Sequence, residues 1–196
     1  MTIEQEIKLF EFVSTMHGKQ KYCGAPYVTH LFQTVQVLKS EAIERDDYII
    51  AAYCHDLLED TEITENELEK SLMEIGFLEE DVKRAIQIVS NLTVFPKKYG
   101  EQLHIFSKQR YRMAISHDKD SMIIKLCDRV VNLQSSIANH STGHIKKYLR
   151  EHSEYFEKFI FRIMRHNGDD FLLEILSWRY QNLINFMVKM TEPSES

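Results

Sequence analysis

One histidine and three acids stand close together in the stretch AAYCHDLLEDT, residues 51–61. Residues four apart on a helix lie one above the other, so a helix here places Glu59 one turn from His55 and Asp60 one turn from Asp56. Carboxylates packed this closely repel each other, by about 0.2–0.5 kcal/mol per exposed pair and by more in a cleft. A bound cation would remove the repulsion. The alternative is a helix end at which Glu59 and Asp60 are solvated.

A metal site needs further ligands, and two residues elsewhere in the chain are candidates. His30 follows the segment PYVT and lies close to an apolar helical stripe, so a core histidine is the alternative. Asp128 lies in the apolar segment SMIIKLCDRVVNL, where a carboxylate is costly unless it is paired or metal-bound; Lys125 or Arg129 offers a salt bridge instead. Two imidazoles and two carboxylates suit Mn²⁺, Fe²⁺ or Zn²⁺. The candidate ligands are His30, His55, Asp56 and Asp128.

Three segments resemble, in order, the motifs of the HD-superfamily metal-dependent phosphohydrolases. The segment HGKQKYCGAPYVTH resembles H-x-x-Q-x-R-K-S-G-x-P-Y-x-x-H-P, AAYCHDLLEDT resembles A-A-x-L-H-D-x-x-E-D-T, and IKLCDRVVNL resembles I-K-L-A-D-R-x-x-N-M/L. Within the superfamily the chain is most similar to the (p)ppGpp hydrolase domain of Rel/Spo-type enzymes and to small stand-alone alarmone hydrolases. The similarity spans roughly residues 5–140, and the family's separate synthesising domain is not expected in this chain.

The resemblance implies an all-α, single-domain HD-type helical fold and hydrolysis of the 3′-pyrophosphate of (p)ppGpp. One Mn²⁺ per site is implied, with Fe²⁺ or Zn²⁺ as alternatives. By position, His30, His55, Asp56 and Asp128 match the metal ligands. Glu59 and Asp60 match the catalytic acids, which would orient and deprotonate the attacking water. The positions implied for substrate binding are Lys19, Lys21, Tyr22, Cys23, Arg110 and Asn132.

One departure from the family pattern affects the expected substrate. The family's Arg-Lys-Ser is Lys21-Tyr22-Cys23 here, and a lysine stacks on a base less well than an arginine. An HD phosphohydrolase acting on another nucleotide therefore stays open, for example on the 2′-phosphate of NADPH or on an adenosine alarmone. A regulator that binds nucleotide without turnover is a third alternative, against which the intact acids argue.

Basic residues after the second motif offer contacts for the remaining phosphates, although a solvated helix face is the alternative. Arg110 is the preferred member because it falls near a family position. The group is Lys97, Lys98, Lys108, Arg110 and Arg112. The other histidines are expected to be surface or packing residues: His17, His104, His117, His140, His144, His152 and His166.

The composition limits the class of protein and the kind of partner. The chain has 196 residues and a net charge of −6, so we expect a small anionic nucleotide as partner rather than nucleic acid, whose binders are usually basic. No apolar run of about 18 residues occurs, so no membrane span is expected. The odd cysteine number, without C-x-x-C spacing or a signal-like N-terminus, indicates reduced thiols and a cytoplasmic protein. A homo-oligomer is left open.

Apolar residues recur at helical spacing through nearly the whole chain, which predicts helices throughout. Capping boxes are predicted at Thr2 with Gln5 and at Thr64 with Glu67, and Gly76 is a helix stop. The stretch over residues 51–61 is expected to lie on the helix that begins near residue 46.

Other boundaries follow from glycine, proline and acidic residues. Residues 17–25 are expected to be a loop, Pro26 to lie in the first turn of the next helix, and Asp46 or Asp47 to cap the one after it. Later helices are predicted near 101–116, 119–139, 143–167 and 170–190. We expect one HD-type domain over 1–190 and a polar, fraying tail over 191–196.

Overall fold

Helix α8 (Lys119–Ala138) is buried along most of its length and lies at the centre of the molecule. The computed structural model describes residues 1–168 and 170–191. Met122, Leu126 and Leu133 are fully buried at helical spacing, which explains why a carboxylate on this helix must find a partner. Helices α2 (Val28–Ser40), α3 (Asp46–Cys54) and α11 (Phe171–Thr191) all pack against α8.

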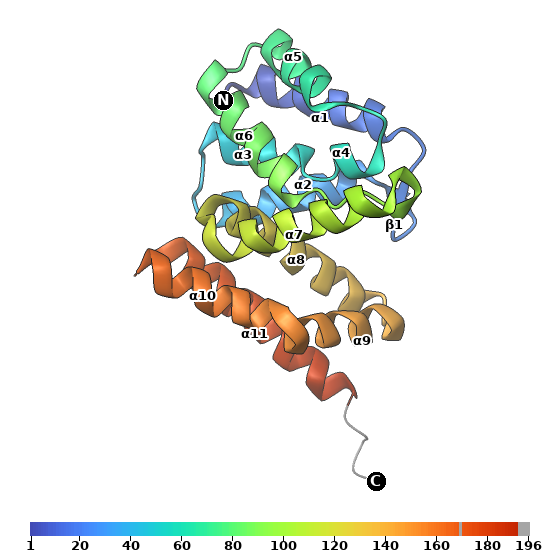
Figure 1. The fold of residues 1–196 in the computed structure, drawn as a ribbon, viewed down its shortest axis with the longest axis vertical. Coiled ribbons are helices and arrows are strands. Elements are labelled where there is room, and N and C mark those ends of the chain that lie inside the picture. The colour runs from blue at the N-terminus through green and yellow to red at the C-terminus, as the bar shows by residue number, and fades with distance from the viewer. Residues whose placement is uncertain (169, 192–196) are drawn as a thin grey trace.

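The N-terminal helices surround one side of α8, as Figure 1 shows. The predicted all-α fold is confirmed. Both capping boxes form, and Gly76 ends its helix in the left-handed conformation, as predicted. The remaining helices of this part are α1 (Ile3–His17), α4 (Leu57–Asp60), α5 (Glu65–Ile75), α6 (Glu79–Leu92), η1 (Lys97–Tyr99) and α7 (Glu101–His117).

The C-terminal helices cover the opposite side of α8 (Figure 1). Residues 142–167 are helical throughout, in agreement with the helix predicted over 143–167, but one turn within them has a different hydrogen-bonding pattern. A π-helical turn, η2 (His152–Phe156), separates α9 (Thr142–Glu151) from α10 (Glu157–Asn167). This turn places the Phe156 ring centroid 5.1 Å from that of Tyr180 and puts His152 Nδ1 3.1 Å from the Tyr180 hydroxyl. The side chains of His152 and Phe156 thus both contact α11.

A short hairpin replaces part of the loop predicted over 17–25. Strands β1 (Lys21–Tyr22) and β2 (Ala25–Pro26) pair antiparallel, with Tyr22 opposite Ala25. Cys23 and Gly24 connect them with φ values of 50° and 86°, the positive φ at both positions that a two-residue hairpin turn uses. Pro26 therefore ends β2 rather than entering the helix, and α2 begins at Val28.

The predicted acidic cap of α3 is also corrected. The helix follows Arg45, and both acids stand in its first turn, where they still favour the positive end of the helix. Arg45 donates to both oxygens of Asp47, at 3.1 and 2.6 Å, and no side chain caps the helix.

A partly buried polar cluster ties α3, α6 and α8 together away from the candidate site. Asp120 accepts a hydrogen bond from the Tyr48 hydroxyl at 2.5 Å and two from Arg84, at 2.9 and 2.7 Å. Burial opposes the charged carboxylate, but the Tyr48 and Arg84 hydrogen bonds outweigh it and lower the pKa of Asp120. The cluster therefore stabilises the fold when Asp120 is ionised.

None of the helices within residues 1–168 and 170–191 is long and apolar enough to cross a membrane. Cys23 is exposed and Cys54 and Cys127 are buried, and all three are free thiols. Thr191 is the last residue of α11, so the predicted tail over 191–196 otherwise lies outside the described residues.

Candidate metal centre and substrate cleft

The chain breaks its helical course at the candidate ligands, so the prediction of one continuous helix through residues 46–60 is wrong. Helix α3 ends at Cys54, and α4 begins at Leu57. His55 and Asp56 stand in the break, where His55 Nε2 lies 3.0 Å from Asp56 Oδ2. The break therefore brings two neighbouring residues to one point, which successive positions on a regular helix could not do.

The four predicted ligands meet at this break. His30 Nε2 lies 3.2 Å from Asp128 Oδ1 and 3.8 Å from Asp56 Oδ2. His55 Nε2 lies 3.7 Å from Asp128 Oδ1. One ligand atom from each of His30, His55 and Asp56 falls within 4.8 Å of the other two, so these three could hold one metal ion together.

The protonation of His55 fits a metal ion. Its Nδ1 lies 2.9 Å from the Ala52 carbonyl, which can only accept, so Nδ1 carries a proton and Nε2 faces the two carboxylates, where a metal ion would take the place of a second ring proton. Nε2 is buried and has no hydrogen-bond partner among the described residues. An orphaned nitrogen beside two carboxylates is a donor set that suits a divalent cation.

The charges of the site also favour a bound cation. Burial disfavours the imidazolium, but Asp56 and Asp128 outweigh it and raise the pKa of His55 well above its usual range. Burial also disfavours both carboxylates, yet His55 lowers the pKa of Asp56, and Lys125 with the two histidines lowers that of Asp128. The site thus keeps two negative charges and attracts a cation.

Neighbouring side chains orient the two carboxylates. The Tyr27 hydroxyl donates to Asp56 Oδ2 at 2.6 Å, and Lys125 Nζ donates to Asp128 Oδ2 at 2.6 Å. The salt bridge considered as an alternative for Asp128 is thus present, but it uses Oδ2 and leaves Oδ1 facing the histidines. Asn132 Nδ2 also donates to Asp128 Oδ1.

His17 contacts Tyr27, which bonds to Asp56, and Gln20, which bonds to the backbone of Asp60, although the sequence indicated only packing or surface exposure for it. It is 3% exposed, and its ring stacks on Tyr27 at 4.5 Å. His17 Nδ1 lies 2.7 Å from Gln20 Oε1, and Gln20 Nε2 donates to the Asp60 carbonyl at 2.7 Å. The motif spacing H-x-x-Q was the available signal, because it places both side chains at one helix end.

The proposed catalytic acids stand just beyond the ligands. Glu59 is half-buried and accepts the Val94 N–H at 3.0 Å. Burial raises the pKa of Glu59, and burial together with the charge on Asp56 raises that of Asp60. Glu59 lines a cleft of about 410 Å³, whereas Asp60 is more exposed.

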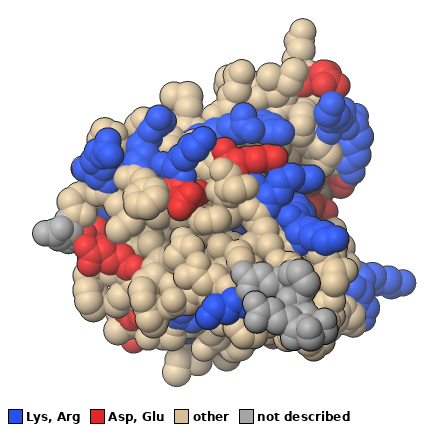
Figure 2. Space-filling model, turned by 90° about the horizontal axis from the view of Figure 1, so that it is seen from below, with Lys and Arg blue, Asp and Glu red and all other residues tan. Residues whose placement is uncertain are grey.

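Cations from three helices surround this cleft. Its basic lining residues are Lys108 and Arg112 of α7, Lys125 and Arg129 of α8, and Arg150 of α9. Arg129 and Arg150 were not among the residues predicted from sequence. On the face in Figure 2, Lys and Arg side chains gather in a band with Asp and Glu set among them, so the net charge of −6 hides local positive surface.

Arg110, the arginine preferred from sequence, lies elsewhere. It lines a separate, mostly apolar hollow with Phe106 and Met113. Residues on α7 two positions apart, such as Arg110 and Arg112, point in different directions, which sequence alone could not resolve. Lys97 and Lys98 lie exposed in η1 and are not among the residues that line the cleft.

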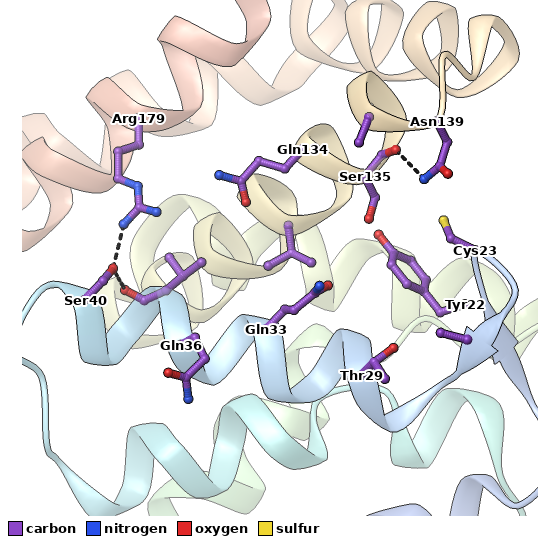
Figure 3. A pocket seen from close by; sticks show the side chains of 14 residues that line it. Tyr22, Cys23, Thr29, Gln33, Gln36, Ser40, Gln134, Ser135, Asn139 and Arg179 are labelled. Atoms are coloured by element: carbon purple, nitrogen blue, oxygen red, sulfur yellow. Dashed lines mark hydrogen bonds between the residues drawn. The ribbon is translucent and has the colours of Figure 1, made fainter.

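A second cavity, of about 560 Å³, lies between the hairpin, α2, α8 and α11. In Figure 3, Tyr22 and Cys23 approach it from the hairpin, and Ser135 and Asn139 from α8. The Tyr22 hydroxyl donates to Asn132 Oδ1 at 3.1 Å, so these two predicted substrate residues also meet. Lys19 and Lys21 are exposed and are not part of the cavity lining.

Comparison with known proteins shows which family the chain is similar to. A family model described as HD domain matches residues 10–162. The chain is 29% identical over 137 residues to guanosine-3′,5′-bis(diphosphate) 3′-pyrophosphohydrolase of Aquifex aeolicus, covering 67% of this chain and 18% of that protein. It is 28% identical over 130 residues to GTP pyrophosphokinase rsh of Brucella ovis, covering 65% and 16%. The chain thus spans less than a fifth of the length of either relative.

A solved structure shares the fold. It is described as a metazoan ortholog of SpoT that hydrolyzes ppGpp and plays a role in starvation responses. The TM-score is 0.68 at 18% identity, over 95% of this chain and 97% of that one. Because the HD domain model spans most of the residues and the motifs fall at the cluster described above, the chain belongs to the HD domain family and is related to the ppGpp hydrolase domains of the Rel and SpoT enzymes.

Proposed function

We propose that the protein is a metal-dependent phosphohydrolase that removes the 3′-pyrophosphate of (p)ppGpp. One observation carries the proposal: the cluster of His30, His55, Asp56 and Asp128 adjoins Glu59, which itself lines a cleft surrounded by cations. The candidate cation site thus adjoins a carboxylate of raised pKa, that of Glu59, and a cleft whose basic side chains could bind phosphate. The relatives named guanosine-3′,5′-bis(diphosphate) 3′-pyrophosphohydrolase support the choice of substrate.

His30, His55, Asp56 and Asp128 would hold the metal, with Mn²⁺ proposed and Fe²⁺ or Zn²⁺ as alternatives. When bound, such an ion supplies Lewis-acid activation of water and neutralises charge on phosphoryl oxygens. Lys125 holds the second oxygen of Asp128, so Oδ1 keeps facing the histidines, and Tyr27 donates to Asp56 Oδ2, the oxygen that itself faces them. Glu59 is not among these ligands, so its carboxylate would be available to accept a proton from the attacking water.

In the proposed reaction, water attacks the proximal phosphorus of the 3′-diphosphate and the bond from that phosphorus to the ribose oxygen breaks. The ribose oxygen gains a proton, and pyrophosphate leaves. Glu59 would accept the proton of the water at its carboxylate, which the Val94 N–H holds in place. Asp60 would orient the water. Gln20 donates a hydrogen bond to the backbone carbonyl of Asp60 and so holds the end of α4 in place.

The cationic cleft suits the phosphates of such a substrate. Lys108 and Arg112 form no ion pair with any described residue, so their charges remain available. Arg129 is paired with Glu151 at 2.6 Å, but its buried Nε has no partner within the described part of the chain. The nucleoside would lie toward Tyr22 and Cys23, at the other cavity.

A second candidate is hydrolysis of another nucleotide that carries a 2′- or 3′-phosphate, such as NADPH or an adenosine alarmone. The observation in its favour is the lining of the cavity in Figure 3, where neutral amides of Gln33, Gln134 and Asn139 and the ring of Tyr22 gather. Amides both donate and accept, so they suit more than one base. The raised pKa of Glu59 disfavours a regulator without turnover.

The test is a phosphate-release screen on protein stripped with a chelator and reloaded with Mn²⁺, Fe²⁺ or Zn²⁺. Substrates are ppGpp, pppGpp, ppApp and NADPH, and pyrophosphate and orthophosphate are measured separately. We expect pyrophosphate from ppGpp and a strict need for metal. Release of orthophosphate from NADPH alone would move the function to the second candidate, and no turnover by metal-loaded protein would refute the proposed enzymatic activity.

We also propose that the protein acts in the cytoplasm.

A further inference from the structure

The two histidines of the metal centre are held differently. His55 Nδ1 donates to the Ala52 carbonyl, which fixes the ring and its tautomer. His30 Nδ1 is buried but has no hydrogen-bond partner in the described part of the chain. A metal-binding histidine almost always donates its other N–H to an acceptor that orients the ring. His30 lacks this contact, so something else must orient it.

The aromatic ring of Tyr22 packs against the His30 ring instead. Its ring centroid lies 4.5 Å from that of His30, with the planes tilted by 35°. Its hydroxyl donates to Asn132 Oδ1 at 3.1 Å, and Asn132 Nδ2 donates to Asp128 Oδ1. One side chain thus touches His30 directly and reaches Asp128 through one amide.

The hairpin holds Tyr22 in this position. Tyr22 pairs with Ala25 across the two strands, and the turn between them has positive φ at both residues. The Tyr27 N–H donates to the Gln20 carbonyl at 3.1 Å and closes the hairpin at its base. The Tyr27 ring meets that of Tyr22 edge-on at 6.3 Å, so Tyr22 is confined between Tyr27 and His30.

We propose that Tyr22 is a positioning residue that fixes the His30 imidazole by ring contact and, less strongly, orients Asp128 through Asn132. The inference rests on the proposed metal site. It assigns to this residue a role that is separate from base recognition, although Tyr22 also lines the cavity of Figure 3. The ring is the larger contribution because its centroid lies 4.5 Å from that of His30, closer than the Tyr27 ring at 5.8 Å, and His30 Nδ1 has no hydrogen bond within the described residues.

The experiment measures Mn²⁺ affinity, by the electron paramagnetic resonance signal of free Mn²⁺, independently of any turnover. Tyr22→Leu removes ring and hydroxyl, and we expect binding weaker by about 10–100-fold, the usual loss for such a supporting residue. Tyr22→Phe keeps the ring, and we expect binding within about 5-fold of wild type, since one net hydrogen bond contributes about 1 kcal/mol. Tyr99→Leu, in η1, is the matched control and should bind as wild type does.

Tyr22→Gln repeats the ring removal with a polar side chain if Tyr22→Leu does not fold, as judged by circular dichroism. Equal Mn²⁺ affinity of wild type and both ring-less variants would overturn the inference and leave the metal site standing. Equal losses in Tyr22→Phe and Tyr22→Leu would overturn the dominant role of the ring. A wild-type protein that binds none of Mn²⁺, Fe²⁺ or Zn²⁺ would overturn the metal site and the inference together.

Discussion

Replacement of Glu59 by glutamine separates catalysis from the fold. The Val94 N–H donates to Glu59 Oε2, and the amide oxygen of glutamine can accept the same bond. We therefore expect the free energy of unfolding to change by less than about 1 kcal/mol, as for a substitution without a new cavity or unpaired group. The glutamine cannot take a proton, so the chemical step loses its base.

The expected loss in kcat is about 10²–10⁴-fold, which is the usual contribution of a general base. At 1.36 kcal/mol per tenfold this equals roughly 3–5 kcal/mol in the barrier. Burial raises the pKa of Glu59, so wild-type activity should fall as pH decreases through that raised pKa, because the carboxyl then keeps its proton. Residual activity of Glu59→Gln should depend less on pH over the same range.

The assay is pyrophosphate release from ppGpp at saturating Mn²⁺ over a pH series, with bound metal measured by atomic absorption. Unchanged melting temperature and metal content with a large loss in kcat would support the role of Glu59. A wild-type kcat in the variant would refute it, and loss of metal at unchanged fold would show that Glu59 is a ligand.

Three further perturbations test other parts of the structure. His55→Ala should remove stoichiometric Mn²⁺ and activity together while circular dichroism stays helical; retained metal would exclude His55 as a ligand. Arg112→Ala should raise KM for ppGpp by about tenfold or more through a lost charged contact, whereas Arg110→Ala should not, since only the former lines the cleft beside Glu59. Asp120→Asn should lower unfolding free energy by about 1–3 kcal/mol at pH 7. Because the folded pKa of Asp120 is depressed, that difference should shrink as pH falls below about 4 in urea titrations, and a constant difference would contradict the assignment.

The candidate metal centre could be predicted from sequence because its residues stand in three recognisable segments. Chemical type and spacing identified His30, His55, Asp56 and Asp128, and the structure brings them together. The break between α3 and α4 was not predictable in the same way, since apolar spacing continues through it. The break depends on contacts with α2 and α8, which periodicity does not record.

Contacts between distant segments explain the other differences. Arg110 and Arg112 are of the same type and stand two positions apart, and only the packing of α7 against α6, α8 and α10 determines which of them faces the cleft. Cys23 adopts positive φ, which a cysteine seldom does, so the hairpin was read as a loop. Arg150 came from a helix beyond the recognised motifs, and no local pattern marked it.

The place of α8 in the chain affects the order in which the protein can mature. It carries Asp128, so the metal centre stays incomplete until residues near 138 have been synthesised and have packed on α2. A chain released earlier would present His30 and His55 without their buried carboxylate partner. The proposed ligands come from α2, from the break before α4 and from α8, so we do not expect metal to nucleate folding as it does in a zinc finger, whose ligands are close in sequence. In a growing chain, metal uptake would report that the core helix has docked.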